Sequence, residues 1–352
     1  MTVTPTPSTA PALKPSALTS EAAEASDVAR RQIVRHADAF AELGSRLRKT
    51  PPRFVVTCAR GSSDHAASYG KYLIETTLKT VVASVGPSVA SLYDTDLDLK
   101  NSLFITVSQS GRSPDLLKLA EKAKAGGALV VGFINDETSP LSGLCDISLP
   151  LSAGPEISIS ATKSYLASTL AFLSLTAHWS NSQPLKEAVQ ALPDALAAAR
   201  DLDWWPVLDR LSLAEGLFVV GRGPSLGVAC EIALKLKETC CLHAEAFSIA
   251  EVIHGPLAMI GPRLPVLALG QDDLSASSTR QAVERIAAQG GMVWSALPAK
   301  GAALLPTLPG LPPAIAPLCQ IQSFYMAVAR LARCRGYDPD VPAHLRKVTE
   351  TV

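Results

Sequence analysis

The chain alternates between short apolar runs and longer segments in which apolar residues recur with helical spacing. Residues 54–58 (FVVTC) and 103–107 (LFITV) are two such runs, and small polar residues and then a helical segment follow each of them. Strands that alternate with helices in this way are typical of a mostly parallel sheet covered by helices on both faces. The pattern therefore predicts an α/β fold.

The same pattern begins again in the second half of the chain. A strand that enters a small-Arg-Gly-x-Ser turn occurs twice, in residues 54–63 and in residues 217–225. The repeat predicts two similar, doubly wound parallel-sheet domains related by internal duplication. We expect the first domain, with an N-terminal helix, over residues 25–190 and the second over residues 191–338.

Further elements and the two ends complete this picture. Residues 1–24 lack the charged region and unbroken apolar core of a signal peptide, so we expect a disordered tail there. The turn DPDVP near the C-terminus suits a tail, residues 339–352, that folds over the active site. The pattern also predicts a helix that follows the turn at 59–63 and runs through residue 75, and a helix that begins at residue 114. Further helices are expected over 21–47, 185–205 and 315–334, and further strands over 128–134, 147–149, 265–269 and 292–295.

Composition narrows the class of protein. The 352 residues are 47% hydrophobic and 18% charged, which is typical of a globular protein. Lysine plus arginine equals aspartate plus glutamate, 32 each, so we expect neither nucleic acid nor a membrane as a partner. The longest apolar run, residues 166–177, is too short to cross a bilayer. The seven cysteines contain no CxxC pair and predict reduced thiols in a cytoplasmic protein.

The stretch from residue 231 to residue 254 is the first candidate for chemistry. Glu231, Lys235 and Glu238 share one face of a predicted helix, so a lysine is held between two carboxylates. This set fits either a solvated salt-bridge ladder or a general base tuned by a cation and an apolar wall. His254 precedes Gly-Pro, which ends an element and leaves the imidazole on a loop. Histidine transfers protons near neutral pH.

The second candidate is the loop 108–113 (SQSGRS), which lies between a predicted strand and a predicted helix. Its backbone N–H groups and three hydroxyls would converge at the helix N-terminus, which is a site suited to a phosphate. Ser113 before Pro114 is also a good helix N-cap, and both roles can hold. The nucleotide-binding patterns GxxxxGK[ST] and GxGxxG are absent. A compact sugar phosphate therefore suits the loop better than ATP or NAD.

These residues resemble the sugar isomerase (SIS) family and, within it, the isomerase half of glucosamine-6-phosphate synthase. The resemblance covers roughly residues 50–352 and rests on SQSGRSPD, ATKSY, the stretch from EIALKLKE to HGP, and the closing DPDVPAHLRK. It implies that the sugar phosphate is held mainly by the serine-rich loop, and it implies no metal and no cofactor. The substrate-binding residues that it implies are Ser63, Ser108, Gln109, Ser110, Ser113 and Ser160.

The resemblance also implies catalytic roles that suit the residue types. Moving a carbonyl between C1 and C2 of a sugar needs one base that removes a proton from one carbon and returns it to the next. That base would be Glu238 with Lys235 as its companion, while His254 opens the sugar ring. Lys347 would form an imine with the ketose, and its alternative is a surface lysine in a basic tail. In the family this histidine reaches the site of a neighbouring subunit, which implies a homodimer with shared sites.

Three departures from the family shape the functional prediction. Ala161 stands where a serine is usual and Ile253 where a lysine is frequent, and both positions bear on the sugar contacts. The family's synthases begin with a glutaminase domain whose nucleophile is an N-terminal cysteine, whereas this sequence begins Met1-Thr2, so we expect no glutamine hydrolysis. The sequence thus predicts a glucosamine-6-phosphate deaminase, which carries out the sugar chemistry with free ammonia instead of glutamine. The alternatives are a deaminase for another amino-sugar phosphate, such as galactosamine 6-phosphate, and a sugar-phosphate sensor without turnover.

Overall fold

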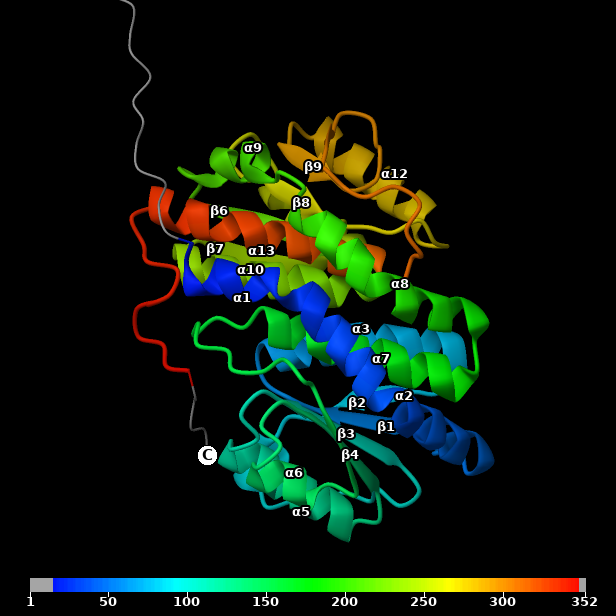
Figure 1. Ribbon diagram of the computed structural model, residues 1–352. Helices are drawn as coiled ribbons and strands as arrows, with labels where there is room; N and C mark the ends of the chain where they lie inside the picture. Colours follow the sequence, from blue (N-terminus) through cyan, green and yellow to red (C-terminus); the bar gives the residue numbers. More distant parts are fainter. Residues whose placement is uncertain (1–14, 348–352) are drawn as a thin grey trace, which may run out of the picture.

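A computed structural model describes residues 15–347 and contains two five-stranded parallel sheets flanked by helices (Figure 1). The strand order is β2-β1-β3-β4-β5 in the first sheet and β10-β9-β8-β6-β7 in the second. The two orders are the same when β6 is matched with β1 and β8 with β3. The predicted α/β fold with two similar parallel sheets is therefore confirmed.

The elements of the first half follow the predicted alternation of strands and helices. They are α1 (Ala17–Ala23), α2 (Ala25–Lys49), β1 (Val55–Cys58), α3 (Ser62–Leu78), β2 (Val82–Ser84), α4 (Ser88–Ser91), β3 (Leu103–Ser108), α5 (Pro114–Ala125), β4 (Leu129–Ile134), α6 (Pro140–Leu144), β5 (Ile147–Pro150) and α7 (Lys163–Ser180).

The second half repeats this order after a helix that joins the halves. Its elements are α8 (Gln183–Arg200), α9 (Trp205–Leu208), β6 (Gly216–Gly221), α10 (Pro224–Cys240), β7 (His243–Ser248), α11 (Ile249–Val252), β8 (Val266–Ala268), α12 (Ala276–Ala288), β9 (Val293–Ser295), β10 (Ala303–Leu304) and α13 (Ala316–Cys334).

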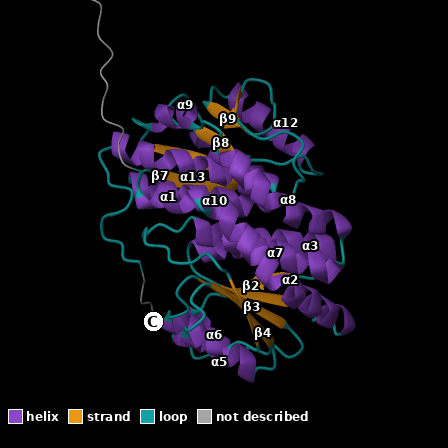
Figure 2. Cartoon of the chain, in the orientation of Figure 1, coloured by secondary structure: helices purple, strands orange, loops and turns teal. Residues whose placement is uncertain are grey.

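The two halves share a hydrophobic core. The central strands β1 and β3 are buried along their whole length, as expected for parallel strands covered on both faces. Helices α3, α7, α10 and α13 lie between the two sheets (Figure 2). One cluster of buried side chains runs through all four of these helices and includes Tyr69, Tyr165, Ile232 and Phe324. Helix packing rather than a linker therefore holds the two sheets together.

The N-terminal part of the chain differs from the prediction. Residues 17–23 form α1 and are not the disordered tail that we predicted over residues 1–24; residues 1–14 lie outside the described part of the chain. The hydroxyl of Ser16 caps α1 by accepting a hydrogen bond from Thr19 N at 3.1 Å, and Leu18 is fully buried. Asp340 also accepts hydrogen bonds from Ala17 N at 2.8 Å and Leu18 N at 2.9 Å. This short helix was not predicted because the prolines, serines and threonines around it are typical of a disordered tail.

Two further differences concern helix α8 and the sheet edges. The predicted domain boundary at residues 190/191 falls inside α8, which contacts α2 and α7 of the first half and α13 of the second.

The sequence analysis also missed β2, β7 and β10, which are all edge strands. Edge strands are short or only partly covered, so they carry no continuous apolar run; His243 and Glu245 of β7 are both exposed.

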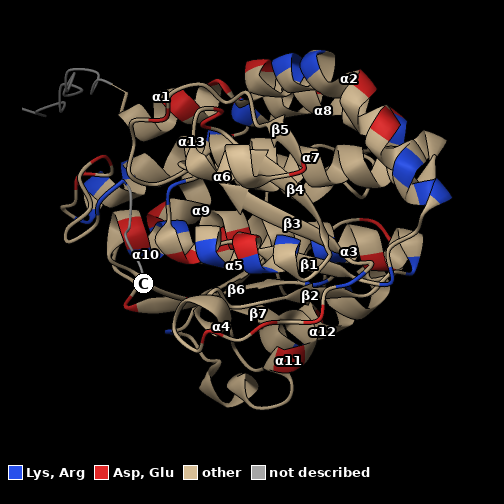
Figure 3. Cartoon of the chain, turned by 90° about the horizontal axis from the view of Figure 1, so that it is seen from below, with Lys and Arg blue, Asp and Glu red and all other residues tan. Residues whose placement is uncertain are grey.

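Charged residues of both signs are interspersed on the outer helices. Figure 3 shows lysine or arginine next to aspartate or glutamate along α2 and α5. This distribution agrees with the equal totals of basic and acidic residues in the sequence. Among residues 15–347, no helix combines the length and the apolar character needed to cross a membrane.

Candidate active site

A pocket of about 320 Å³ opens at the C-terminal ends of β1 and β3, with α10 of the second half as its far wall. This volume lies in the usual range for small-ligand sites, roughly 300–1,000 Å³. The chain leaves β1 toward β2 on one side and β3 toward β4 on the other, so the pocket is at the switch point where open α/β sheets bind ligands. Of the predicted site residues, the pocket brings together Ser63, Ser108, Gln109, Ser110, Ser113, Lys235, Glu238 and Lys347.

One end of the pocket is built from the N-termini of α3 and α5 and the serine-rich loop before α5. Ser108 Oγ accepts a hydrogen bond from Gly111 N at 2.9 Å, which closes the loop on itself. Gly111 has φ +62°, and a Cβ there would collide with the side chain of Ser139, so this turn requires glycine. Ser113 occupies the N-cap position of α5 but makes no capping hydrogen bond. Within residues 15–347 the hydroxyl is thus not used for capping, and it faces the pocket that Ser113 lines.

Arg60 adds a positive charge to this end of the pocket, and the sequence analysis did not single it out. Its Nε and Nη2 donate to Asp115 Oδ2 at 3.0 Å and 2.8 Å. The Asp115 side chain is fully buried, whereas that of Arg60 is 49% exposed. A buried carboxylate thus anchors a guanidinium in the pocket wall, where it favours an anionic ligand. The signal for Arg60 was its presence in a turn that the sequence repeats.

The other end of the pocket carries the charged face of α10. Lys235 Nζ donates to Glu238 Oε2 at 2.5 Å and lies 3.4 Å from Glu231 Oε1. The side chains of Glu231 and Lys235 are 0% and 1% exposed, so a solvated ladder is wrong for these two residues. Glu238 is 19% exposed and is the carboxylate that lines the pocket.

Glu231 organises a buried network behind the pocket. It forms a hydrogen bond with His65 Nδ1 at 2.9 Å, and Tyr325 Oη donates to it at 3.2 Å. Burial alone would raise the pKa of Glu231, but Lys235 and His65 hold that pKa below its usual value. Burial likewise opposes the charged form of Lys235, yet Glu231 and Glu238 hold the pKa of this lysine above its usual value. The carboxylate and the ammonium therefore stay charged although both are buried.

We expect Glu231→Gln to lower the free energy of unfolding by about 2–3 kcal/mol at pH 7, because hydrogen bonds to a charged group are lost. The pKa of Glu231 is lower in the folded state, so its stabilisation is complete above its unfolded pKa, about 4.3. That stabilisation disappears as the pH falls through the folded-state pKa. Urea unfolding at several pH values measures the difference between wild type and variant, with Glu245→Gln on exposed β7 as the control. A difference that stays constant from pH 7 to pH 3 would contradict this assignment.

Lys347 is held at the mouth of the pocket by the loop between β5 and α7. Its Nζ donates to Ser158 O at 2.6 Å and to Glu156 Oε2 at 3.2 Å. Glu156 is buried and also accepts hydrogen bonds from Thr162 N at 2.9 Å and Ser164 Oγ at 2.6 Å. The lysine is thus positioned by a rigid acceptor. The sequence analysis missed Glu156 because this loop has no periodic pattern.

Comparison with known proteins places the chain in a family. The model of the SIS domain matches residues 51–177 and 210–296, which is more than half of the chain. The chain belongs to the SIS domain family. It is 31% identical over 308 residues to the isomerizing glutamine–fructose-6-phosphate aminotransferase of Thermococcus kodakarensis, a match that covers 83% of this chain and 51% of the relative. The chain therefore spans about half the length of the curated relatives it matches.

Two solved structures illustrate what this SIS protein resembles. A protein from Silicibacter pomeroyi DSS-3, named as a candidate phosphosugar isomerase, is 40% identical with a TM-score of 0.89, and the match covers 93% of this chain and all of the other. The glucosamine-6-phosphate deaminase of Thermotoga maritima is 20% identical with a TM-score of 0.70, and covers 92% of this chain and all of its own. The second likeness shows the fold alone.

Two predicted site residues of this SIS protein lie outside the pocket. Ser160 is buried, and its hydroxyl has no hydrogen-bond partner in the part of the chain described; its neighbours Ile159 and Ala161 line the pocket instead. His254 is exposed between α11 and a short 3₁₀ turn (Pro256–Met259), and its N donates to Glu251 O at 3.0 Å. Within one chain, the structure does not bring His254 to the pocket of Glu238.

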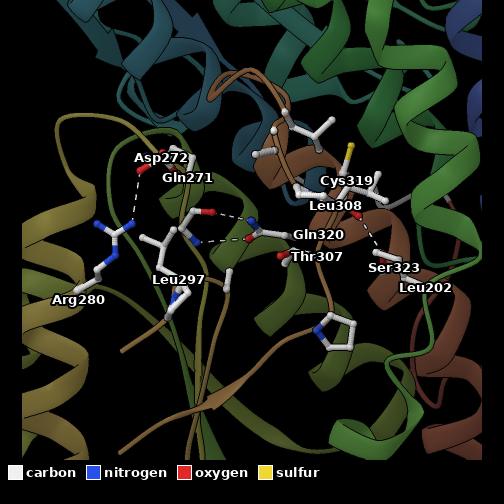
Figure 4. A pocket seen from close by; sticks show the side chains of 18 residues that line it. Leu202, Gln271, Asp272, Arg280, Leu297, Thr307, Leu308, Cys319, Gln320 and Ser323 are labelled. Atoms are coloured by element: carbon white, nitrogen blue, oxygen red, sulfur yellow. Dashed lines mark hydrogen bonds and ion pairs between the residues drawn. The ribbon is translucent and has the colours of Figure 1, made fainter. Parts of the chain in front are cut away.

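A separate cavity of about 220 Å³ lies beside α13 in the second half (Figure 4). Two pairs of its polar groups already bind each other: Gln320 Nε2 donates to Gly270 O at 2.6 Å, and Arg280 pairs with Asp272 at 3.4 Å. The predicted site residues do not line this cavity. The candidate active site is therefore the pocket at β1 and β3.

Proposed function

We propose that this SIS protein is a glucosamine-6-phosphate deaminase, which converts glucosamine 6-phosphate and water into fructose 6-phosphate and ammonia. The observation that carries the proposal is that Glu238, Lys347 and the 108–113 loop line one pocket. A base, an amine and a phosphate site are the three parts that the reaction needs. The names of the curated relatives, which are isomerizing aminotransferases for fructose 6-phosphate, support this type of sugar chemistry.

Each step of the proposed reaction is assigned to one of these groups. The serine loop and Arg60 hold the phosphate, and ring opening exposes the C1 aldehyde. Glu238 then removes the proton from C2 and returns it to C1, while O1 gains a proton and the amine nitrogen loses one, so that C1 becomes a hydroxymethyl group and C2 an imine. Lys347 exchanges with this imine and releases ammonia, and water then hydrolyses the lysine imine to fructose 6-phosphate. Lys235 keeps Glu238 in place and in the pocket through the 2.5 Å contact.

The direct test is ammonia release from a panel of amino-sugar phosphates. We expect the highest kcat/KM with glucosamine 6-phosphate and a lower value with galactosamine 6-phosphate. A preference for galactosamine 6-phosphate would change the substrate but keep the reaction. Tight binding of these compounds without any ammonia release would instead favour a sugar-phosphate sensor and refute the proposal.

The double substitution Ser110→Ala and Ser113→Ala is expected to raise the KM for glucosamine 6-phosphate about 10-fold, because two hydroxyl donors to the phosphate are lost. Inhibition by inorganic phosphate should weaken in parallel. Steady-state kinetics measures both effects, and Ser20→Ala, an exposed serine on α1, is the control. Unchanged KM and phosphate inhibition would mean that the phosphate binds elsewhere.

A further inference from the structure

The second half contains a larger cavity, of about 630 Å³, at the place that corresponds to the candidate active site. It lies at the C-terminal ends of β6 and β8, and α3 of the first half forms its far wall, just as α10 does in the first pocket. The turns that enter both sites have the same backbone. The N-cap residue of α3, Gly61, has φ 52° and ψ −129°, and that of α10, Gly223, has φ 63° and ψ −135°. Each half therefore has a cavity at the corresponding place, beside a turn of the same conformation.

The second site has lost the acid–base groups of the first. Leu73 and Thr76 stand at the same steps of α3, counted from the N-cap glycine, as Lys235 and Glu238 stand in α10. The loop after β8 has also changed, because Asp273 now lines the cavity. Its Oδ2 accepts from Gln271 Nε2 and its Oδ1 from Ser275 N, both at 2.8 Å, so the carboxylate closes the loop on itself. The positions of the lysine and the carboxylate that line the first pocket thus hold a leucine and a threonine here.

Arg222, the counterpart of Arg60, remains. It precedes the N-cap glycine of α10, is half-buried and lines the cavity. Arg60 is anchored on Asp115, the second residue of α5, but the second residue of α12 is the exposed Ser277. Within residues 15–347, the guanidinium of Arg222 accordingly has no hydrogen bond and no ion pair. A partly buried guanidinium without a counterion is unfavourable until an anion binds to it.

We propose that this cavity is a second, non-catalytic binding site for a small phosphate ester. The phosphate pairs with Arg222, because a guanidinium matches phosphate oxygens in a bidentate geometry. The body of the ligand lies against the apolar part of the wall, which includes Leu73, Pro224 and Pro313. The cavity is about twice as large as the first pocket, which leaves room for a body larger than a hexose. Glu251 lies at the exposed rim and disfavours a second negative charge there.

The test uses the full chain that carries Ser110→Ala and Ser113→Ala, so that binding at the first pocket is weak. Isothermal titration with inorganic phosphate, fructose 6-phosphate and adenosine 5′-monophosphate measures what remains. We expect at least one of the two esters to bind at about one site per chain, and more tightly than inorganic phosphate. Adding Arg222→Met should weaken this binding about 10- to 100-fold.

Two matched variants make the result specific. Arg222→Lys keeps the charge and should retain part of the affinity, and Arg280→Met, an arginine outside the cavity, should retain all of it. Unfolding curves show whether each variant is folded. The proposal is overturned if neither ester binds in the millimolar range, or if Arg222→Met binds as tightly as its parent. Ammonia release tests the proposed function separately, and its absence would leave these binding results unchanged.

Discussion

Glu238→Gln is expected to reduce ammonia release from glucosamine 6-phosphate by about 10²-fold or more, while the affinity for fructose 6-phosphate stays nearly the same. The amide keeps the shape of the side chain and can still contact Lys235, but it cannot accept and return the C2 proton. Glu238 is the carboxylate of α10 that lines the pocket, because Glu231 is fully buried behind it. A coupled assay for ammonia measures turnover, and titration with fructose 6-phosphate measures binding.

The control for this experiment is Glu245→Gln, which removes a carboxylate from the exposed face of β7. It should leave turnover unchanged. If Glu238→Gln retained most of its activity, Glu238 would be only a structural partner of Lys235, and another group would have to move the proton.

Mixing two inactive proteins, Glu238→Gln and His254→Ala, is expected to restore about a quarter of the wild-type activity if subunits exchange at random. The reason is the place of His254, which is exposed and lies outside the pocket of its own chain. In a homodimer with shared sites, half of the molecules are mixed dimers. Each mixed dimer has one site with both native residues. Ammonia release after exchange measures the recovery.

Subunit exchange has to be demonstrated independently, for example by co-purification of chains with two different tags. Each inactive protein incubated alone is the control and should remain inactive. Exchange without recovered activity would refute the shared site and place His254 in the site of its own subunit, or outside any site.

The sequence predicted well those parts of the fold that have strong local patterns. The strand over 103–107 and the helix over 315–334 agree with β3 and α13 to within a residue, because a largely apolar, β-branched run and a long amphipathic repeat are clear patterns. The pocket was also predictable in part. Its serine-rich loop and the Lys235–Glu238 pair lie on contiguous motifs, so a single segment of sequence carries each of them.

The parts that were missed depend on contacts between residues far apart in the sequence. His65 reaches Glu231 from α3, and Glu156 reaches Lys347 across more than half of the chain. The burial of Glu231 also depends on this packing, since the helix pattern alone fits a solvated face equally well. Arg222 looked like a repeat of Arg60, and only the structure shows that Arg60 has a carboxylate partner whereas Arg222 has none within residues 15–347.

The contact between Asp340 and the first turn of α1 makes the C-terminal segment a brace for the N-terminus as well as the carrier of Lys347. Deletion of residues 339–352 would remove the Asp340 carboxylate, which accepts from Ala17 N and Leu18 N, together with the lysine. A shortened chain would thus lose activity through two causes that kinetics cannot separate. The substitution Lys347→Met keeps the brace and removes only the amine, so it is the informative way to question the chemistry of this end of the protein.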